Sequence, residues 1–232
     1  MHEEAIADAV ARVAGRVAAA AERAGRDPGE VTIVAATKGV GAEAIAAAAR
    51  AGLRDFGENR AKDLESKSRS SDPSVRWHFL GAVQTNKVRF LDRAALIHGL
   101  DRLREAEALQ ARSERISRDW DVLLEVNMAG SGAKQGVSPE EVAGLIDGLS
   151  AYPRVRPRGL MFMAPQVENP EDVRAMFAEA RALGERCGLS ELSMGMSDDF
   201  EVAVEEGSTI VRIGRAIFRP QDGAERLPLE DV

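Results

Sequence analysis

The sequence predicts an α/β protein in which eight strands alternate with helices and close into a single (βα)8 barrel of the TIM type. Eight short apolar segments, bounded by Gly, Asn, Asp or Pro, recur along 232 residues. Helical patterns separate them, and this alternation is typical of a parallel sheet. A doubly wound open sheet is the alternative. The Gly-rich fingerprint of such sheets is absent, because only Gly39 and Gly41 follow the first segment.

The eight predicted strands are rich in Val, Ile, Leu, Phe or Met. In chain order they are Val31–Lys38, Arg54–Asn59, Arg76–Gly81, Ala95–Leu100, Asp121–Met128, Arg156–Met163, Glu191–Ser197 and Thr209–Gly214. We expect one domain over residues 1–232, with an additional helix over 1–27 and a polar tail over 220–232.

Helices are predicted between the strands by apolar spacing and by capping residues. Gly41–Gly52 is Ala-rich, and Arg102–Arg118 has apolar residues at helical spacing. Ser138 is followed by Pro-Glu-Glu, which is the signature of a capping box, and Asn169 begins a helix in the same way. Asp198 or Asp199 is expected to cap a short helix that ends near Gly207.

Composition excludes several classes of function. The net charge is −7, so neither nucleic acid nor an anionic membrane is favoured as a partner. Cys187 is the one cysteine, so it can neither form an internal disulfide nor be the basis of a metal-binding cluster of cysteines. The first residues lack the pattern of a signal peptide, and no apolar run reaches the ~18 residues of a membrane span. We therefore expect a cytosolic protein.

Active sites of such barrels lie at the C-terminal ends of the strands. Lys38 closes the first apolar strand, where desolvation favours the neutral amine that attacks an aldehyde. Ser197, Arg212 and Gly214 lie at the ends of strands seven and eight, where phosphate sites are common. A lysine opposite a phosphate site has two explanations. One is pyridoxal 5′-phosphate (PLP), and the other is an aldolase that forms an imine with a sugar phosphate.

Several stretches resemble the YggS-type pyridoxal-phosphate homeostasis proteins, also called proline synthase co-transcribed homologues. They span nearly the whole chain in order: Val34–Lys38, Phe56–Asn59, Trp77–Gly81 with Gln84–Lys87, Lys134–Gly136, Arg158–Met161, Leu192–Asp198 and Gly207–Phe218. Two departures, Arg60 and Arg219, stand where the family often has Tyr and Gly. They affect neither the lysine nor the phosphate residues.

The resemblance implies a barrel like the N-terminal domain of bacterial alanine racemase, with PLP held as a Schiff base on Lys38. It also implies further cofactor-binding residues. Ser197 and the N–H groups of Gly214 and Arg215 would hold the phosphate, Arg212 would face the pyridine nitrogen, Asn59 would lie near the ring, and Met196 would wall the site. The family is associated with controlling free PLP and supplying it to other enzymes.

The residues favour a carrier without catalytic turnover. An Arg at the pyridine nitrogen leaves it unprotonated and weakens the electron sink. A racemase needs a second acid or base, and the one tyrosine, Tyr152, lies at the wrong end of the barrel. His78 is expected to pack in mid-strand, and Lys134 to be a solvated loop lysine. A PLP-dependent racemase-like enzyme ranks second and an aldolase third. We expect a monomer, with apo PLP-dependent enzymes as recipients.

Overall fold

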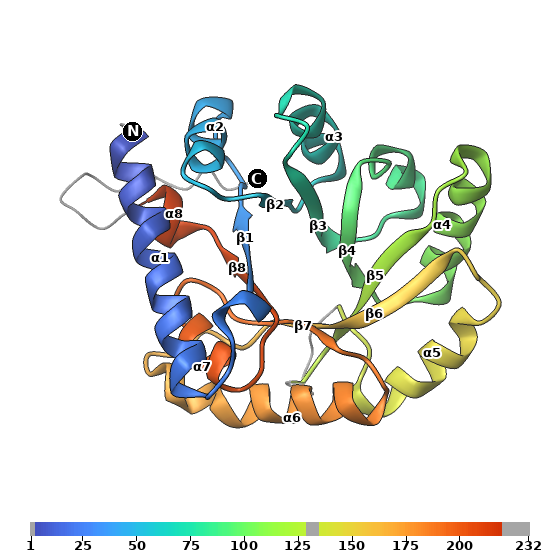
Figure 1. The fold of residues 1–232 in the computed structure, drawn as a ribbon. Helices are drawn as coiled ribbons and strands as arrows, with labels where there is room; N and C mark the ends of the chain where they lie inside the picture. The colour runs from blue at the N-terminus through green and yellow to red at the C-terminus, as the bar shows by residue number, and fades with distance from the viewer. Residues whose placement is uncertain (1–2, 129–134, 220–232) are drawn as a thin grey trace.

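Eight parallel strands close into a barrel in chain order, from β1 round to β8 and back to β1 (Figure 1). The structure is a computed structural model, and it describes residues 3–128 and 135–219. The strands are β1 (Thr32–Ala36), β2 (Asp55–Glu58), β3 (Arg76–Ala82), β4 (Ala94–Leu100), β5 (Trp120–Val126), β6 (Val155–Phe162), β7 (Glu191–Ser193) and β8 (Ile210–Ile213). The predicted (βα)8 barrel is thus confirmed.

The early ends of two strands, β1 and β7, matter for the site. β1 ends at Ala36, so Lys38 lies in the following turn, where Gly39 has a φ of 69°. β7 ends at Ser193, so Ser197 lies in a loop in which Gly195 has a φ of 92°. A positive φ turns the chain out of the extended conformation, which apolar periodicity does not reveal. The other six strands lie within two residues of their predicted bounds.

Helices surround the barrel (Figure 1). They are α1 (Glu3–Arg23), α2 (Ala42–Arg50), α3 (Ala61–Ser70), α4 (Leu103–Ile116), α5 (Val142–Leu149), α6 (Arg174–Arg186), α7 (Phe200–Glu205) and α8 (Arg215–Phe218), with 3-10 turns η1 (Pro28–Glu30), η2 (Thr85–Phe90), η3 (Pro139–Glu141) and η4 (Pro170–Val173). The predicted N-terminal helix is confirmed but ends at Arg23. The predicted tail, 220–232, lies outside the described residues.

The expected caps at Ser138 and Asn169 are confirmed, although each opens a 3-10 turn before its helix. Ser138 and Glu141 form the reciprocal bonds of a capping box. The Asn169 side chain accepts a hydrogen bond from the Glu171 N–H, at 3.2 Å. Asp199 precedes α7, but its carboxylate accepts a hydrogen bond from the Met196 N–H at 2.6 Å instead of capping the helix. This bond tightens the loop that carries Ser197.

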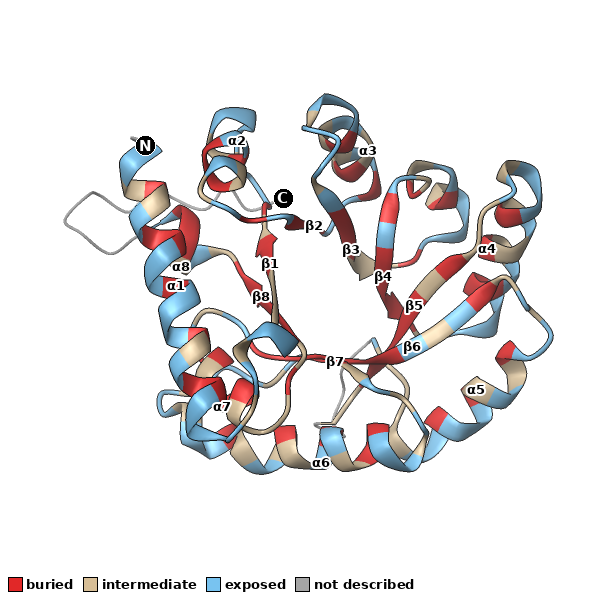
Figure 2. Cartoon of the chain, in the orientation of Figure 1, coloured by how far each residue is buried: buried red, intermediate tan, exposed pale blue. Residues whose placement is uncertain are grey.

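Side chains alternate between two cores along each strand, as the pleat requires. One core lies between the strands and the helices, and it contains most of the buried apolar residues (Figure 2). The other fills the barrel and consists of Val34, Leu96, Leu123, Met161 and Ile210, with Leu80 against it. Glu125 follows Leu123 by two residues, and Arg212 follows Ile210 by two. The barrel interior is therefore apolar in this layer and contains buried charged residues nearer the C-terminal end.

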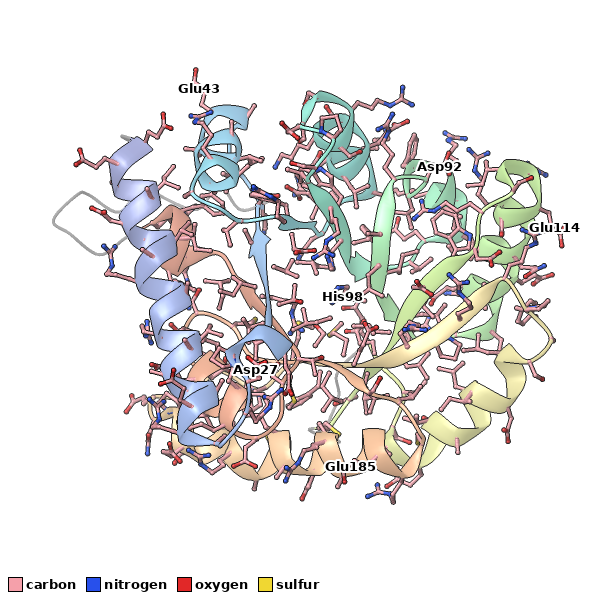
Figure 3. The ribbon with its side chains drawn as sticks, viewed as in Figure 1. Asp27, Glu43, Asp92, His98, Glu114 and Glu185 are labelled. Atoms are coloured by element: carbon pink, nitrogen blue, oxygen red, sulfur yellow. The ribbon has the colours of Figure 1, made fainter. Side chains whose placement is uncertain are left out.

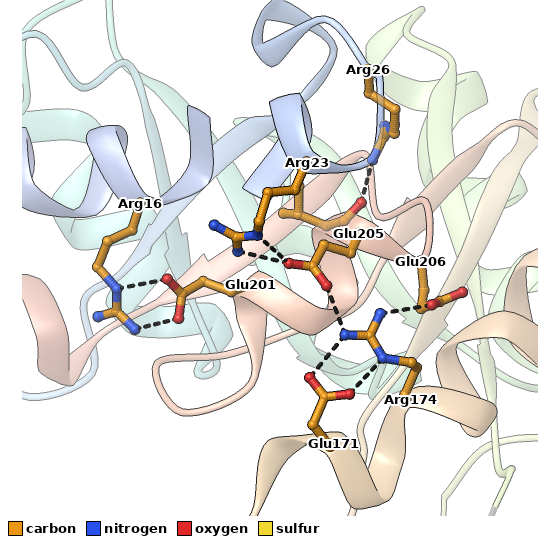
Figure 4. A network of polar contacts seen from close by, with 9 residues as sticks. Arg16, Arg23, Arg26, Glu171, Arg174, Glu201, Glu205 and Glu206 are labelled. Atoms are coloured by element: carbon orange, nitrogen blue, oxygen red, sulfur yellow. Dashed lines mark hydrogen bonds and ion pairs between the residues drawn. The ribbon is translucent and has the colours of Figure 1, made fainter. Parts of the chain in front are cut away.

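Ion pairs join α1 to α7 (Figure 4). Arg16 pairs with Glu201 and Arg23 pairs with Glu205, at 2.8 and 2.7 Å. Arg174, at the start of α6, contacts Glu205 at 2.7 Å, and it also contacts Glu171 and Glu206. These residues join the N-terminal helix to α6 and α7. No helix in the described part of the chain is both long enough and apolar enough to cross a membrane.

Candidate functional site

The loops that follow β6, β7 and β8 enclose a cavity of about 430 Å³ at the C-terminal end of the barrel. Five of the seven expected site residues line it, namely Met196, Ser197, Arg212, Gly214 and Arg215. They gather because β7 and β8 are neighbours in the barrel. This cavity is called the phosphate cavity below.

Backbone donors in the phosphate cavity are available for an anion. Gly214 and Arg215 follow the end of β8, and their N–H groups donate to no acceptor among the described residues. Ser197 lies beside them, because its hydroxyl accepts a hydrogen bond from the Ala216 N–H at 3.4 Å. Two free N–H groups next to a hydroxyl are the donors that a phosphate ester requires. The Arg215 guanidinium pairs with Asp198 at the rim.

Backbone geometry at Gly195 positions Ser197. A Cβ atom on Gly195 would lie 2.6 Å from the Cβ atom of Ala203 and 2.9 Å from the Cα atom of Phe200. The loop therefore runs directly against α7, and only glycine permits both this approach and a φ of 92°. Asp199 holds Met196 from the other side. The loop is consequently fixed at both ends.

Arg212 carries a buried positive charge at the floor of the cavity. Only 6% of the residue is exposed. One terminal nitrogen donates to the Ser193 carbonyl at 2.7 Å and to the Ser193 hydroxyl at 2.5 Å, and the other donates to the Phe162 carbonyl at 3.0 Å. Burial lowers the pKa of Arg212 to about 10, against the opposing effect of Asp199 and Glu125. The guanidinium therefore stays protonated at neutral pH, and its Nε–H has no acceptor within the described residues.

Lys38 is exposed, and it does not line the phosphate cavity, although Ala36 does. The expectation of a desolvated lysine is therefore wrong for this structure, because β1 ends before Lys38 is reached. The preceding residue is rigidly held. The Thr37 hydroxyl donates to Glu58 at 2.7 Å, and Lys67 donates to the Thr37 carbonyl at 2.8 Å and pairs with Glu58. Glu58 and Lys67 were missed as supports of the Lys38 turn.

Asn59 is exposed after β2 and lines a different cavity of about 340 Å³, together with Arg60, Gln84 and Lys87. The strand order places both cavities at the same end of the barrel. Lys38 lies between them, because β1 pairs with β8 on one side and with β2 on the other.

Other buried polar residues were not singled out from the sequence. His98 is fully buried inside the barrel (Figure 3) and contacts His78, which packs in the interior as expected. Glu125 is also buried, and burial raises its pKa to about 7. Lys134 lies outside the described residues. Within residues 3–128 and 135–219, no cluster of His, Cys, Asp or Glu is arranged to hold a metal ion.

These residues fit a phosphorylated aromatic ligand such as PLP. Free N–H groups and a hydroxyl suit the phosphate, a buried guanidinium suits a ring acceptor, and an exposed lysine lies at the end of the neighbouring strand. The groups come from β1, β7 and β8, which adjoin one another in the closed sheet.

Known proteins resemble this chain over most of its length. Residues 10–221 match the family model described as the alanine racemase N-terminal domain. A pyridoxal phosphate homeostasis protein of Aquifex aeolicus is 42% identical over 90% of this chain and 95% of its own length. One of the same name from Pseudomonas aeruginosa is 39% identical over 94% and 96%.

A solved structure of PipY from Synechococcus elongatus, described with PLP bound, is also similar. Its sequence is 34% identical, its TM-score is 0.76, and the match covers 89% of this chain and 99% of PipY. This chain therefore belongs to the alanine racemase N-terminal domain family and, within it, to the pyridoxal phosphate homeostasis proteins.

Proposed function

We propose that this chain binds PLP for intracellular PLP homeostasis, with Lys38 as the residue of covalent attachment and the phosphate cavity as the anchor. The observation that carries the proposal is the pair of free N–H groups at Gly214 and Arg215, which lie in one cavity with Ser197 and the buried Arg212. The PLP-bound structure of PipY and the names of the relatives support the same ligand.

Each residue has a defined part in binding. The N–H groups of Gly214 and Arg215 and the Ser197 hydroxyl donate to phosphate oxygens, and Met196 covers one wall. Arg212 donates toward the pyridine nitrogen. When bound, PLP would supply an aldehyde, and the Lys38 amine would hold it covalently.

We propose that the bound cofactor is stored and passed on without turnover. Because Arg212 is a cation with a pKa of about 10, it supplies no proton to the ring nitrogen at neutral pH, and the electron sink is weak. Tyr152 precedes β6, so it lies at the N-terminal end of the barrel, away from the cavity. We further propose a cytosolic monomer that supplies apo PLP-dependent enzymes. Asn59, in the neighbouring cavity, would contact the exposed edge of the ring.

The test is the visible absorbance of the full chain with PLP, for wild type, Lys38→Ala and the exposed control Lys62→Ala. We expect a band above the protein absorbance in the wild type and in Lys62→Ala, and none in Lys38→Ala. Borohydride reduction followed by peptide mapping should place the adduct on Lys38. A wild type without the band refutes PLP binding at Lys38.

Two further assays separate a carrier from an enzyme. The PLP-loaded protein should reactivate an apo PLP-dependent enzyme faster than PLP dissociates from the loaded protein into solution. It should not convert L- or D-amino acids at a measurable rate. Steady racemisation of an amino acid would favour the racemase-like alternative.

A further inference from the structure

A chain of buried hydrogen bonds crosses the barrel interior and ends at Arg212. Asp55 and His78 are joined at 2.9 Å between Oδ1 and Nε2, and His78 and His98 at 3.0 Å between Nδ1 and Nε2. The His98 Nδ1 atom lies 2.9 Å from the Ser193 hydroxyl, which accepts from Arg212. The five residues come from β2, β3, β4, β7 and β8, and all five are buried.

The chain has a definite direction from cation to anion. Burial opposes ionisation of Asp55, but hydrogen bonds from His78 and Arg76 outweigh it and lower the pKa of Asp55. Burial, together with the nearby charges of His78 and Arg212, lowers the pKa of His98 well below its ordinary value. Asp55 is thus an ionised acceptor and His98 is neutral.

The tautomers follow from these charges. The Asp55 carboxylate accepts only, so His78 donates from Nε2. When His78 is neutral, its Nδ1 atom accepts from the Nε2–H of His98. The Nδ1 atom of His98 then accepts from the Ser193 hydroxyl, whose oxygen accepts from Arg212. In this state each link donates toward Asp55, and both rings carry their proton on Nε2.

One proton taken up by His78 reverses part of this chain. Both nitrogens of His78 then donate, so the His98 Nε2 atom must accept and its proton must lie on Nδ1. His98 then donates to the Ser193 hydroxyl, which loses its own acceptor while it still accepts from Arg212. The hydrogen bonding of Ser193 to Arg212 therefore changes when a proton arrives at His78, three links from Arg212.

Solvent reaches His78 from the N-terminal mouth of the barrel. This mouth is lined by His78 and Asp55, with further charges on Glu30, Arg76, Asp121, Arg158 and Glu191. Arg212 faces Asp199 and Glu125 at the other end. The hydrogen-bonded chain is the direct polar connection between these two groups of charges.

We propose that His78, His98 and Ser193 are positioning residues that hold the Arg212 guanidinium toward the phosphate cavity and transmit the protonation state of the N-terminal mouth to it. The consequence for the cofactor rests on the proposed function, because Arg212 is expected to face the pyridine nitrogen. The hydrogen bonds themselves join protein residues only and do not depend on the cofactor.

The first test needs no cofactor. Nitrogen-15 spectra of the full chain should show both rings as Nε2–H tautomers when His78 is neutral, and His98 as the Nδ1–H tautomer when His78 is protonated. Ser193→Ala should speed hydrogen exchange of the Arg212 guanidinium at least about tenfold, the effect of losing one hydrogen bond to a charged group. A neutral His78 beside an Nδ1–H tautomer of His98, or unchanged exchange in Ser193→Ala, would overturn the proposal.

The second test uses the PLP-loaded protein and measures the rate of PLP release against pH. In the wild type the rate should change over the pH range in which the spectra show His78 taking up its proton. Ser193→Ala and His98→Phe should lose this dependence, whereas Ser208→Ala, which removes a buried hydroxyl outside the chain, should keep it. If Ser193→Ala and His98→Phe both keep the pH dependence of PLP release, the proposed transmission is refuted. A wild type that binds no PLP refutes the proposed function instead, and the first test still decides the positioning role.

Discussion

Replacing Glu125 with Gln should remove one contribution to the pH dependence of the stability of the protein. The Glu125 carboxyl lies inside the barrel with only 5% of the residue exposed, and it has neither a hydrogen bond nor an ion pair within the described residues. Burial raises its pKa to about 7, and Asp101 adds to this effect while Arg212 opposes it. Ionisation of Glu125 is thus unfavourable in the folded state.

The size of the effect follows from the difference between the folded and ordinary pKa values. One pKa unit corresponds to about 1.4 kcal/mol, so a rise from 4.5 to about 7 corresponds to about 3 kcal/mol. The folded state holds the proton more tightly than the unfolded state. This contribution to stability is therefore complete below the unfolded pKa and is lost as the pH rises through the folded one.

Glutamine keeps the shape of the side chain and cannot ionise. At about pH 8.5, Glu125→Gln should be more stable than the wild type by about 2 to 3 kcal/mol, whereas at about pH 5 the two should agree within about 1 kcal/mol. Urea unfolding at both pH values measures the difference. Glu107→Gln, at an exposed position of α4, is the matched control and should follow the wild type. Equal differences between Glu125→Gln and wild type at the two pH values would refute the reasoning.

Three further substitutions test the supports of the site and the fold. Gly195→Ala should cost about 3 kcal/mol and weaken PLP retention, because the new Cβ atom would lie 2.6 Å from that of Ala203. Lys67→Met should cost about 3 kcal/mol, since it leaves the buried Glu58 carboxylate without its cation. Arg174→Met should cost about 1 kcal/mol at low salt and less at about 1 M salt, because its three carboxylate contacts are partly screened.

Each of these has a control that shares the chemistry but lacks the contact. Gly188→Ala keeps a positive φ with open space around the new atom, so it should cost less than Gly195→Ala. Lys62→Met and Arg186→Met remove exposed cations and should lie within about 0.5 kcal/mol of wild type. Thermal and urea unfolding measure all six variants. If a control loses as much stability as its partner, the contact named for that partner does not account for the loss.

The barrel could be predicted because the alternation of apolar strand and helix patterns is repeated along the sequence. Eight apolar segments separated by helical patterns leave few arrangements that bury every strand on both faces. The ends of β1 and β7 were not predictable from the same signal. At Gly195 the chain turns through a positive φ, and apolar residues lie on both sides of the turn, so the pattern extends β7 too far. After β1, nothing in Thr37 or Lys38 marks the end of the strand before the turn at Gly39.

Contacts across the barrel could not be predicted from the sequence for a different reason. His98 and Ser193 are 95 residues apart and meet only because the sheet closes. Nothing local to either residue indicates the other. The pair of Glu58 and Lys67 is closer in sequence, nine residues apart, yet it joins a strand end to a helix face, and the polar composition of α3 gave no sign that Lys67 turns inward.

The strand order explains why five expected residues meet in one cavity while Lys38 and Asn59 lie apart from it. Residues that follow β7 and β8 share a cavity, whereas Asn59 follows β2, one strand beyond β1. Lys38 follows β1 and is therefore the one expected residue adjacent to both groups. Its backbone is fixed through Thr37 and the buried Glu58, and its side chain is exposed. A fixed base with an unconstrained amine suits a lysine that must reach a ligand anchored on the neighbouring strand and also release it.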